Sequence, residues 1–175
     1  MNVGDLSATV TQEVVVRLGD LVKAIGNAVN VQAVDHACLV HGVEIVVNGE
    51  EVTKYRGDGV IVSTPTGSTG YNLSAGGPVI APETEAIIIT PICPHSLNAR
   101  SIIVSSKDEV QVRIVRSKKT QEEEAIATFD GRKAVKLQTD DVIHIHRAEA
   151  DTRLVKLSKK SFFDVLRTKL GEGQK

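Results

Sequence analysis

This chain has no excess of charge of one sign and no closely spaced set of cysteines, and each absence argues against a class of protein. Its 21 lysines and arginines nearly balance 22 aspartates and glutamates, for a net charge of −1, so the composition gives no sign of a surface for nucleic acid or an anionic membrane. Cys38 and Cys93 lie far apart without metal-ligand spacing. No apolar stretch approaches the length of a signal peptide core or a membrane span. We therefore expect a cytoplasmic protein that binds neither nucleic acid nor a membrane.

Aromatic residues are also scarce, with no tryptophan, two tyrosines and three phenylalanines. A chain of 175 residues, of which 41% are hydrophobic and 25% charged, is long enough to bury one core and falls within the usual size of one domain. We expect a single domain over residues 1–170, followed by a flexible tail over 171–175.

The chain is rich in short β-branched runs separated by turns. Asn48-Gly49 joins the runs 43–47 and 50–55, which is the strongest short signal for a β-hairpin, and Asp130-Gly131 joins 125–129 to 132–137 in the same way. Residues 14–16 favour a strand, and the structure from there to residue 29 stays open. Further strands are expected over 60–63, 86–90, 101–104, 110–115, 142–146 and 152–157, with a C-terminal amphipathic helix capped by Ser161. This pattern predicts a mainly β, sandwich-like or barrel-like domain.

The segment 55–78, YRGDGVIVSTPTGSTGYNLSAGGP, gathers hydroxyl side chains, glycines and one carboxylate around a short apolar strand. Ser68 or Thr69 could cap a short helix that Gly76-Gly77-Pro78 would stop. A strand, a polar loop and a helix start in this order present backbone N–H groups and hydroxyls to one ligand. Asp58, between two glycines, is suited to accept hydrogen bonds from two ribose hydroxyls. The alternative is a glycine-rich turn with solvated hydroxyls.

Four ordered segments resemble the C-terminal domain of NAD kinases. They read YRGDG at 55–59, STPTGSTGY at 63–71, LSAGGP at 73–78 and TPICPHSL at 90–97. The resemblance runs from about residue 30 to residue 166 and so covers most of the chain. It implies a multi-stranded β-sandwich-like domain with a few short helices that binds NAD or NADP.

The resemblance also implies which residues contact the dinucleotide. Asp58 matches the family aspartate that touches the nicotinamide-side ribose, and Asn30 matches the asparagine of an Asn-Glu pair on the adenosine side. Val31 stands where that pair has its acid, and Gly70 replaces the commoner alanine. The residues implied to bind the dinucleotide are Asn30, Arg56, Asp58, Thr69, Gly70, Tyr71, Ser74, Cys93, His95 and Gly131.

One family motif is absent. NAD kinases carry Gly-Gly-Asp-Gly in an N-terminal α/β domain, where its aspartate is the proton acceptor and its glycines hold the donor phosphates; this chain has no such tetrad. Asp58 lies in Arg-Gly-Asp-Gly but precedes the STPTG loop, so it matches the second-domain motif instead. We therefore expect the α/β half to be missing, no catalytic residue to be present, and the chain alone to be inactive. Only a complete enzyme would use Mg-ATP or polyphosphate to phosphorylate the adenosine-ribose 2′-hydroxyl of NAD and give NADP.

NAD kinases form dimers or tetramers through this domain, so the resemblance implies a homo-oligomer. Two alternatives stay open: a non-catalytic NAD or NADP binding module, and a structural oligomerisation domain that has lost its ligand. Retention of Asp58, Thr69, Tyr71 and Ser74 together argues against the second alternative.

The histidines do not indicate a metal site. His144 and His146 alternate on one strand face, but no third ligand is evident nearby in the sequence. Taken alone, His95 fits a structural histidine as well as a ligand contact, and Tyr71 fits a core aromatic as well as a nucleotide contact. The resemblance favours the pocket for both.

Overall fold

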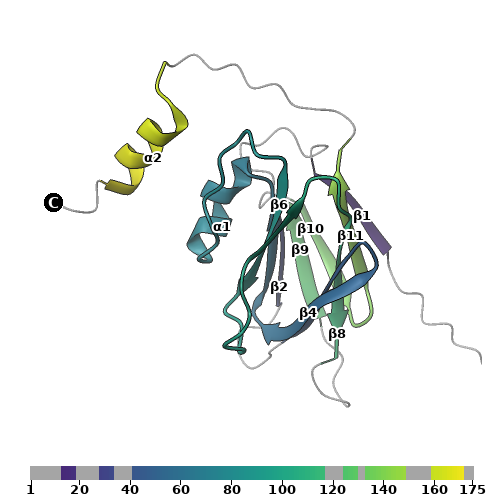
Figure 1. Ribbon diagram of the computed structural model, residues 1–175. Coiled ribbons are helices and arrows are strands. Elements are labelled where there is room, and N and C mark those ends of the chain that lie inside the picture. The colour runs from purple at the N-terminus through teal and green to yellow at the C-terminus, as the bar shows by residue number, and fades with distance from the viewer. Residues whose placement is uncertain are drawn as a thin grey trace, which may run out of the picture.

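The computed structural model describes residues 13–18, 28–33, 41–116, 124–129, 133–148 and 159–171 (Figure 1). The strands are β1 (Glu13–Leu18), β2 (Ala28–Ala33), β3 (His41–Val47), β4 (Glu50–Gly57), β5 (Gly59–Ser63), β6 (Ala86–Ile92), β7 (Ile102–Ser105), β8 (Val110–Val115), β9 (Glu124–Phe129), β10 (Lys133–Gln138) and β11 (Val142–Arg147). The helices are the 3₁₀ helix η1 (Thr66–Thr69), α1 (Tyr71–Ser74) and α2 (Phe162–Gly171).

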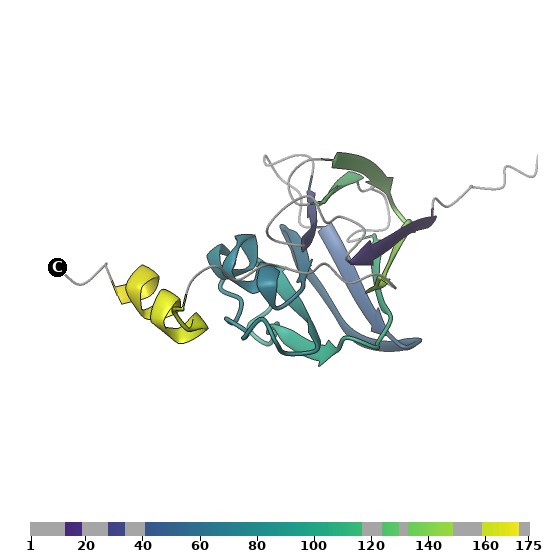
Figure 2. The same ribbon diagram turned by 90° about the horizontal axis from the view of Figure 1, so that it is seen from above.

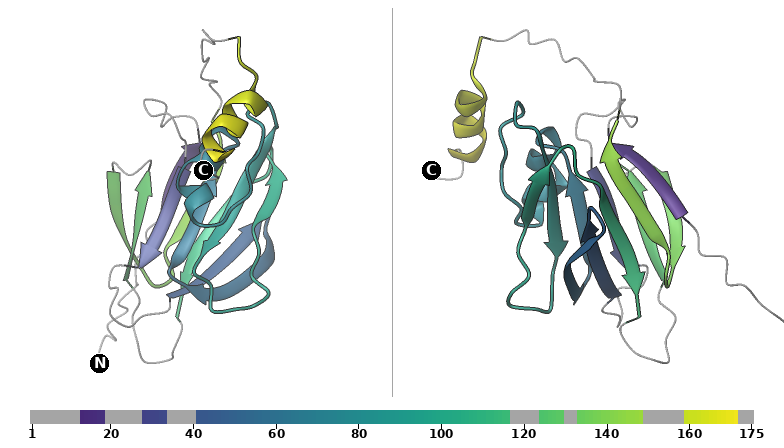
Figure 3. Two further views of the ribbon diagram at one scale, coloured as in Figure 1. Left: turned by 90° about the vertical axis from the view of Figure 1, so that its left-hand side faces the viewer. Right: turned by 45° about the vertical axis from the view of Figure 1, so that its right-hand side comes forward.

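These strands form two sheets that pack face to face (Figure 3). One sheet has the order β1-β11-β8-β3-β4 and the other the order β10-β9-β2-β5-β6-β7. Both sheets contribute to one hydrophobic core, in which Ile45 and Val112 of the first sheet lie with Val62 and Ile89 of the second. Alternating inward apolar side chains on two facing sheets define a β-sandwich, so the expected mainly β, sandwich-like fold is confirmed.

The β3–β4 hairpin forms where its turn residues predict. Asn48 (φ 51°) and Gly49 (φ 83°) both adopt left-handed backbone conformations, which a two-residue turn between twisted strands requires. The Asn48 side chain ties this turn to the start of β8, because its Oδ1 accepts a bond from Glu109 N (3.0 Å) and its Nδ2 donates to Asp108 Oδ1 (2.8 Å). Asparagine here both permits the turn and anchors it.

Most other expected strands are confirmed. The predictions for 60–63, 86–90, 101–104, 110–115 and 142–146 correspond to β5, β6, β7, β8 and β11, and the strand near 14–16 is β1. The paired runs 125–129 and 132–137 correspond to β9 and β10, which are antiparallel. The segment that the sequence left open ends at residue 29 and overlaps β2 only at its first two residues, so β2 was not predicted. The expected strand over 152–157 lies outside the described residues.

The outer face of β5 and β6 is covered by the polar loop, not by solvent. Figure 2 shows α1 on the outer side of the six-stranded sheet, and β5 contacts both η1 and α1. As a result Ile61 and Ser63 of β5, and Ile88 and Thr90 of β6, are buried although they point away from the core shared by the two sheets. Burial on both faces explains why this strand pair reads as continuous apolar runs.

Asp58 marks the point where the chain crosses from one sheet to the other. It is the one residue between β4 of the five-stranded sheet and β5 of the six-stranded sheet. The preceding Gly57 is buried, and a Cβ there would lie 2.8 Å from Ile92 O and 3.0 Å from Pro94 Cα. The absence of a side chain at this position therefore lets the segment after β6 pack directly against the end of β4.

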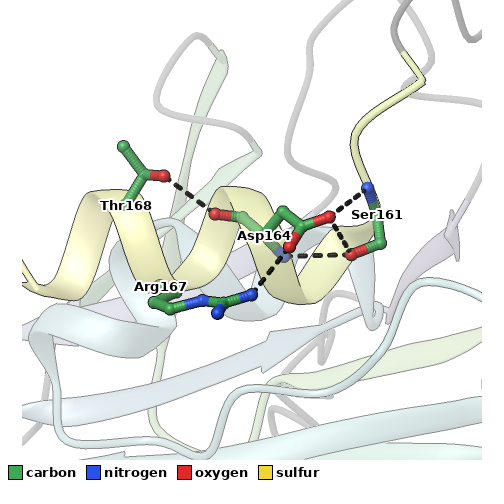
Figure 4. Close-up of polar contacts among 4 residues, drawn as sticks. All are labelled: Ser161, Asp164, Arg167 and Thr168. Atoms are coloured by element: carbon green, nitrogen blue, oxygen red, sulfur yellow. Dashed lines mark hydrogen bonds and ion pairs between the residues drawn. The ribbon is translucent and has the colours of Figure 1, made fainter.

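Ser161 caps α2, as the sequence predicts. Asp164 N donates to Ser161 Oγ (3.1 Å), while Ser161 N (3.0 Å) and Oγ (2.7 Å) both donate to Asp164 Oδ2, a reciprocal N-terminal cap (Figure 4). These bonds, with a smaller contribution from Arg167, hold the pKa of Asp164 below its ordinary value. None of the α2 side chains is buried, and the helix lies apart from the sheets in Figure 1. In the part of the chain that the structure describes, no helix is long and apolar enough to cross a membrane.

Candidate functional site

A fully buried asparagine organises the loop between β5 and β6. The Asn72 side chain is 0% exposed and makes three hydrogen bonds: Nδ2 donates to Ser68 O (3.0 Å) and Pro78 O (3.0 Å), and Oδ1 accepts from Thr90 Oγ1 (2.6 Å). One amide thus connects η1, the end of the glycine-rich segment and strand β6. A buried polar group whose bonds are all made fixes the groups around it.

Two further contacts complete this buried network. Ser68 Oγ accepts a bond from Ile80 N (3.0 Å) and lies 3.3 Å from Ile80 O, to which it donates. Thr90 Oγ1 lies 3.2 Å from Ser101 Oγ. Gly77 leaves room for the amide, because a Cβ there would collide with the Asn72 side chain. We call Ser68, Asn72, Gly77, Thr90 and Ser101 the buried loop network.

The buried loop network leaves the other loop residues at the surface. Thr69, Gly70, Tyr71 and Ser74, all implied to bind the dinucleotide, are exposed, and Tyr71 is 66% exposed. Tyr71 is therefore not a core aromatic. The structure presents these four residues to solvent on a short turn of helix whose inner side is held by hydrogen bonds, which suits a preformed binding surface.

The expected helix cap is wrong in detail. Gly70 is the N-cap of α1, and no side chain caps this helix. Ser68 does not cap because its hydroxyl is buried against Ile80, and Thr69 Oγ1 turns back to Thr66 O (3.4 Å). The 3₁₀ helix η1 contains Ser68 and Thr69, the two residues that the sequence predicts as caps. Tertiary contacts decide which partners their hydroxyls bond.

Asp58 meets a second implied segment that lies far from it in the sequence. Asp58 N donates to Ile92 O (3.0 Å) and His95 N donates to Arg56 O (2.8 Å), so two backbone bonds join the β4–β5 crossing to the segment 92–95. Cys93 sits at the bend with φ 43°. Arg56, Asp58, Cys93 and His95 are thereby brought together, and all four side chains are exposed.

The Cys93 thiol interacts directly with the Asp58 carboxylate. A hydrogen bond to Asp58, and then the negative charge of this carboxylate, raise the pKa of the Cys93 thiol above its ordinary value. The thiol is the donor in this bond because a carboxylate only accepts. The thiol of Cys93 therefore lies beside the carboxylate that the sequence assigns to a ribose.

Two residues implied to bind the dinucleotide remain, Asn30 and Gly131, and for Asn30 the structure gives the backbone pairing. Asn30 lies on β2 in register with Ile61 of β5, which is in register with Thr90 of β6. The backbone of Asn30 is thus two strands from the hydroxyl that holds Asn72. Gly131 lies outside the described residues.

Sequence reasoning did not single out Asn72 or the hydroxyl of Thr90 as members of this site. No role was assigned to Asn72, and Thr90 was given only as the end of the strand 86–90 and the first residue of TPICPHSL. The available signal is the run of residues 86–90, AIIIT, because a hydroxyl that closes an otherwise apolar strand needs a partner when buried. The bond between Cys93 and Asp58 left no signal, since 35 positions separate them in the sequence.

No metal site is evident in the described ranges. No group of three or more histidine, cysteine, aspartate or glutamate side chains gathers there as metal ligands. His144 Nδ1 lies 2.7 Å from Glu109 Oε1, which lowers the pKa of Glu109, and His146 Nδ1 lies 3.0 Å from Arg147 O. Each histidine of the alternating pair thus has its own protein partner.

Comparisons with known proteins agree with this arrangement. The family model of the ATP-NAD kinase C-terminal domain matches residues 27–157. Curated NAD kinases of Lachnoclostridium phytofermentans and Geobacter metallireducens are 63% identical over 131 residues and 46% identical over 132 residues, in each case 75% of this chain, and the matches cover 46% and 45% of those proteins. The chain therefore spans less than half the length of these relatives.

Solved structures show the same likeness. Yeast NADH kinase complexed with NADH has a TM-score of 0.64 and 28% identity, with 85% of this chain and 44% of that chain covered. An NAD kinase from Archaeoglobus fulgidus in complex with ATP has a TM-score of 0.55 and 31% identity, with 72% and 49% covered.

Proposed function

The chain belongs to the NAD kinase family, and from this premise we propose that it is the domain that holds the dinucleotide during phosphoryl transfer. The observation that carries the proposal is the pairing of Asp58 with the segment 92–95, at the point where the chain crosses between the sheets. An exposed carboxylate fixed through its own backbone is suited to accept two ribose hydroxyls.

The ligand-binding step involves an exchange of hydrogen bonds at Asp58. In the free protein the Cys93 thiol donates to this carboxylate. A ribose hydroxyl is the stronger donor, so it replaces or joins the thiol when the dinucleotide binds. Displacing the thiol from the carboxylate on ligand binding therefore costs less free energy than breaking an ion pair would.

The exposed turn of α1 supplies the second contact surface. Thr69, Tyr71 and Ser74 offer hydroxyls, and Gly70 lets a ligand approach the backbone. Because Asn72 between them is fixed by three hydrogen bonds, these groups need little reorganisation on binding, which favours affinity.

The complete enzyme would phosphorylate the adenosine-ribose 2′-hydroxyl of NAD, with Mg-ATP or polyphosphate as donor. Phosphoryl transfer depends on positioning donor and acceptor in line and on neutralising charge on the donor. This chain supplies the acceptor side, and a further α/β domain supplies the donor side. Alone, the chain binds the dinucleotide in the cytoplasm but does not transfer phosphate.

We also propose that the domain forms a homo-oligomer, a dimer or tetramer. Apolar side chains are exposed at separate places: Leu97 is 91% exposed, Ile103 on edge strand β7 is 49% exposed, and Val52 on edge strand β4 is 44% exposed. Exposed apolar residues on unpaired edges favour association. Light scattering after size exclusion tests this, since a mass near 18.8 kDa across the concentration range would contradict it.

Isothermal titration with NAD and NADP tests the binding proposal. We expect saturable binding to the wild-type chain, and Asp58→Asn to weaken it about tenfold or more, because the amide lacks the charge that strengthens both ribose bonds. Asp140→Asn is the matched control, since Asp140 is an exposed aspartate at φ 70°, a conformation that asparagine tolerates.

Two results would change the conclusion. If neither dinucleotide produces heat up to millimolar concentration, or if both variants bind alike, the binding proposal is wrong. A clear preference for NADP over NAD would instead favour the alternative, a non-catalytic module that senses the product.

A further inference from the structure

A pocket lies beside the crossing at Asp58, on the outer face of the five-stranded sheet. It has a volume of about 480 Å³, and the side chains at its rim are Lys54, Arg56, His95, Ser96 and Arg116. Gly42 helps to form it: Gly42 on β3 is in register with Arg56 on β4 and Val115 on β8. Because Gly42 has no side chain between these neighbours, the sheet surface is hollow at this position.

The pocket is lined by positive charge. Lys54, Arg56 and Arg116 are cationic at neutral pH, His95 adds an imidazole, and no carboxylate is among the described residues that line the pocket. All four are exposed at the surface. A chain whose net charge is −1 thus concentrates cations at one end of one sheet.

The Glu44 carboxylate beside Lys54 is already paired with a second cation. Glu44 Oε2 accepts a bond from Arg113 (3.0 Å), and Glu44 Oε1 lies 3.5 Å from Lys54 Nζ. The Lys54 contact is at the limit of a hydrogen bond, and an ammonium group has three protons to donate. Lys54 therefore keeps donors for a second acceptor that enters the pocket.

Backbone bonds hold the rim in place. His95 N donates to Arg56 O at 2.8 Å, so the segment that carries His95 and Ser96 is fixed to the end of β4. Lys54 and Arg56 are two residues apart on the same strand, so they project from one face. The cations come from three strands or their ends, which suits a ligand that accepts several hydrogen bonds at once.

We propose that this pocket binds a phosphate-type oxyanion. Lys54 on β4 and Arg116 after β8 supply charge and donors from the strands that flank β3, Ser96 offers a hydroxyl, and Arg56 and His95 form the wall shared with the proposed dinucleotide site. The volume accommodates an inorganic phosphate or pyrophosphate group. The proposal goes beyond dinucleotide binding at Asp58, and Lys54 and Arg116 have no part in that site.

The oxyanion can come from two sources, which share this chemistry. One is a free anion that binds in addition to the dinucleotide, and the other is a phosphate of the bound dinucleotide itself. They differ in one measurable property, since a free anion binds together with NAD whereas the second source makes phosphate and NAD compete.

The test is isothermal titration of the whole chain with inorganic phosphate and with pyrophosphate at low ionic strength. We expect Arg116→Gln and Lys54→Gln each to weaken pyrophosphate binding by roughly tenfold, the effect of one charge-assisted hydrogen bond. Lys136→Gln is the matched control because it removes the same charge from an exposed position on β10, an edge strand of the other sheet. Its affinity should change less than about twofold.

NAD titrations of the same samples, with and without pyrophosphate, identify the source. Unchanged NAD affinity in the presence of pyrophosphate assigns the pocket to a free anion, and competition assigns it to the dinucleotide phosphate. The oxyanion proposal is overturned if pyrophosphate produces no heat with the wild-type chain, or if Lys136→Gln weakens it as much as Arg116→Gln. NAD binding by Asp58→Asn is scored separately, so either proposal can fail alone.

Discussion

Asn72→Ala tests whether the buried loop network supports the site. The substitution removes three hydrogen bonds and leaves Ser68 O and Pro78 O without their donor inside a buried region. At a net cost of about 1 kcal/mol for each bond, the free energy of unfolding should fall by roughly 3 kcal/mol. Because the vacated volume adds a cavity cost, the loss could reach about 4 kcal/mol. For a domain of this size, a loss of about 3–4 kcal/mol corresponds to a fall in Tm of roughly 6–16 °C.

Urea unfolding followed by far-UV circular dichroism measures this loss, with Asn98→Ala as control. Asn98 is exposed, and within the described part of the chain its bond is made by its backbone N–H, to Ser96 Oγ, so the control should change stability by less than about 0.5 kcal/mol. We also expect weaker NAD binding by Asn72→Ala, because the exposed hydroxyls on either side lose their fixed position. A loss below about 1 kcal/mol, with NAD affinity unchanged, would refute a supporting role for the network.

Three further predictions follow from single contacts. Gly77→Ala should destabilise the chain by about 1–3 kcal/mol in the same urea assay, and much less in an Asn72→Ala background, because its Cβ collides with the Asn72 side chain; additive losses would contradict this. The raised pKa of Cys93 keeps its thiol protonated to higher pH, so labelling by a disulfide reagent at pH 8 should be slow and should accelerate in Asp58→Asn, where the pKa moves down; equal rates would disprove the contact. Ser161→Ala should speed amide exchange in the first turn of α2 about fivefold without shifting the urea midpoint, because the cap is local and the helix buries no side chain.

The local sequence determined a large part of the fold. Asn48-Gly49 predicts its hairpin because both residues tolerate the left-handed backbone that the turn requires. Ser161 predicts the start of α2 because a hydroxyl three residues before Asp164 closes a local ring of bonds. The β-branched runs predict β5 to β8 and β11, since their periodicity reports burial directly.

Other elements depend on partners that lie far away in the sequence. β2 was not predicted because its pairing with β5 and β9, not its own pattern, makes it a strand. Ser68 satisfies every local rule for a helix cap, yet its hydroxyl bonds to Ile80 because the loop folds down onto the sheet. A local rule describes which bonds a residue can make, and packing selects among them.

The sequence by itself determined that this chain is a β domain with a carboxylate and a hydroxyl-rich loop, because residue types and spacing fix local chemistry. The resemblance of its motifs to those of NAD kinases implied the dinucleotide. Only the tertiary structure decided which of these groups meet. It placed Cys93 on Asp58, set Asn72 against Thr90, and left a cationic pocket where Gly42 lies between two strands. Each of these contacts joins segments that only the pairing and packing of the two sheets bring together, and a linear pattern carries no record of that pairing.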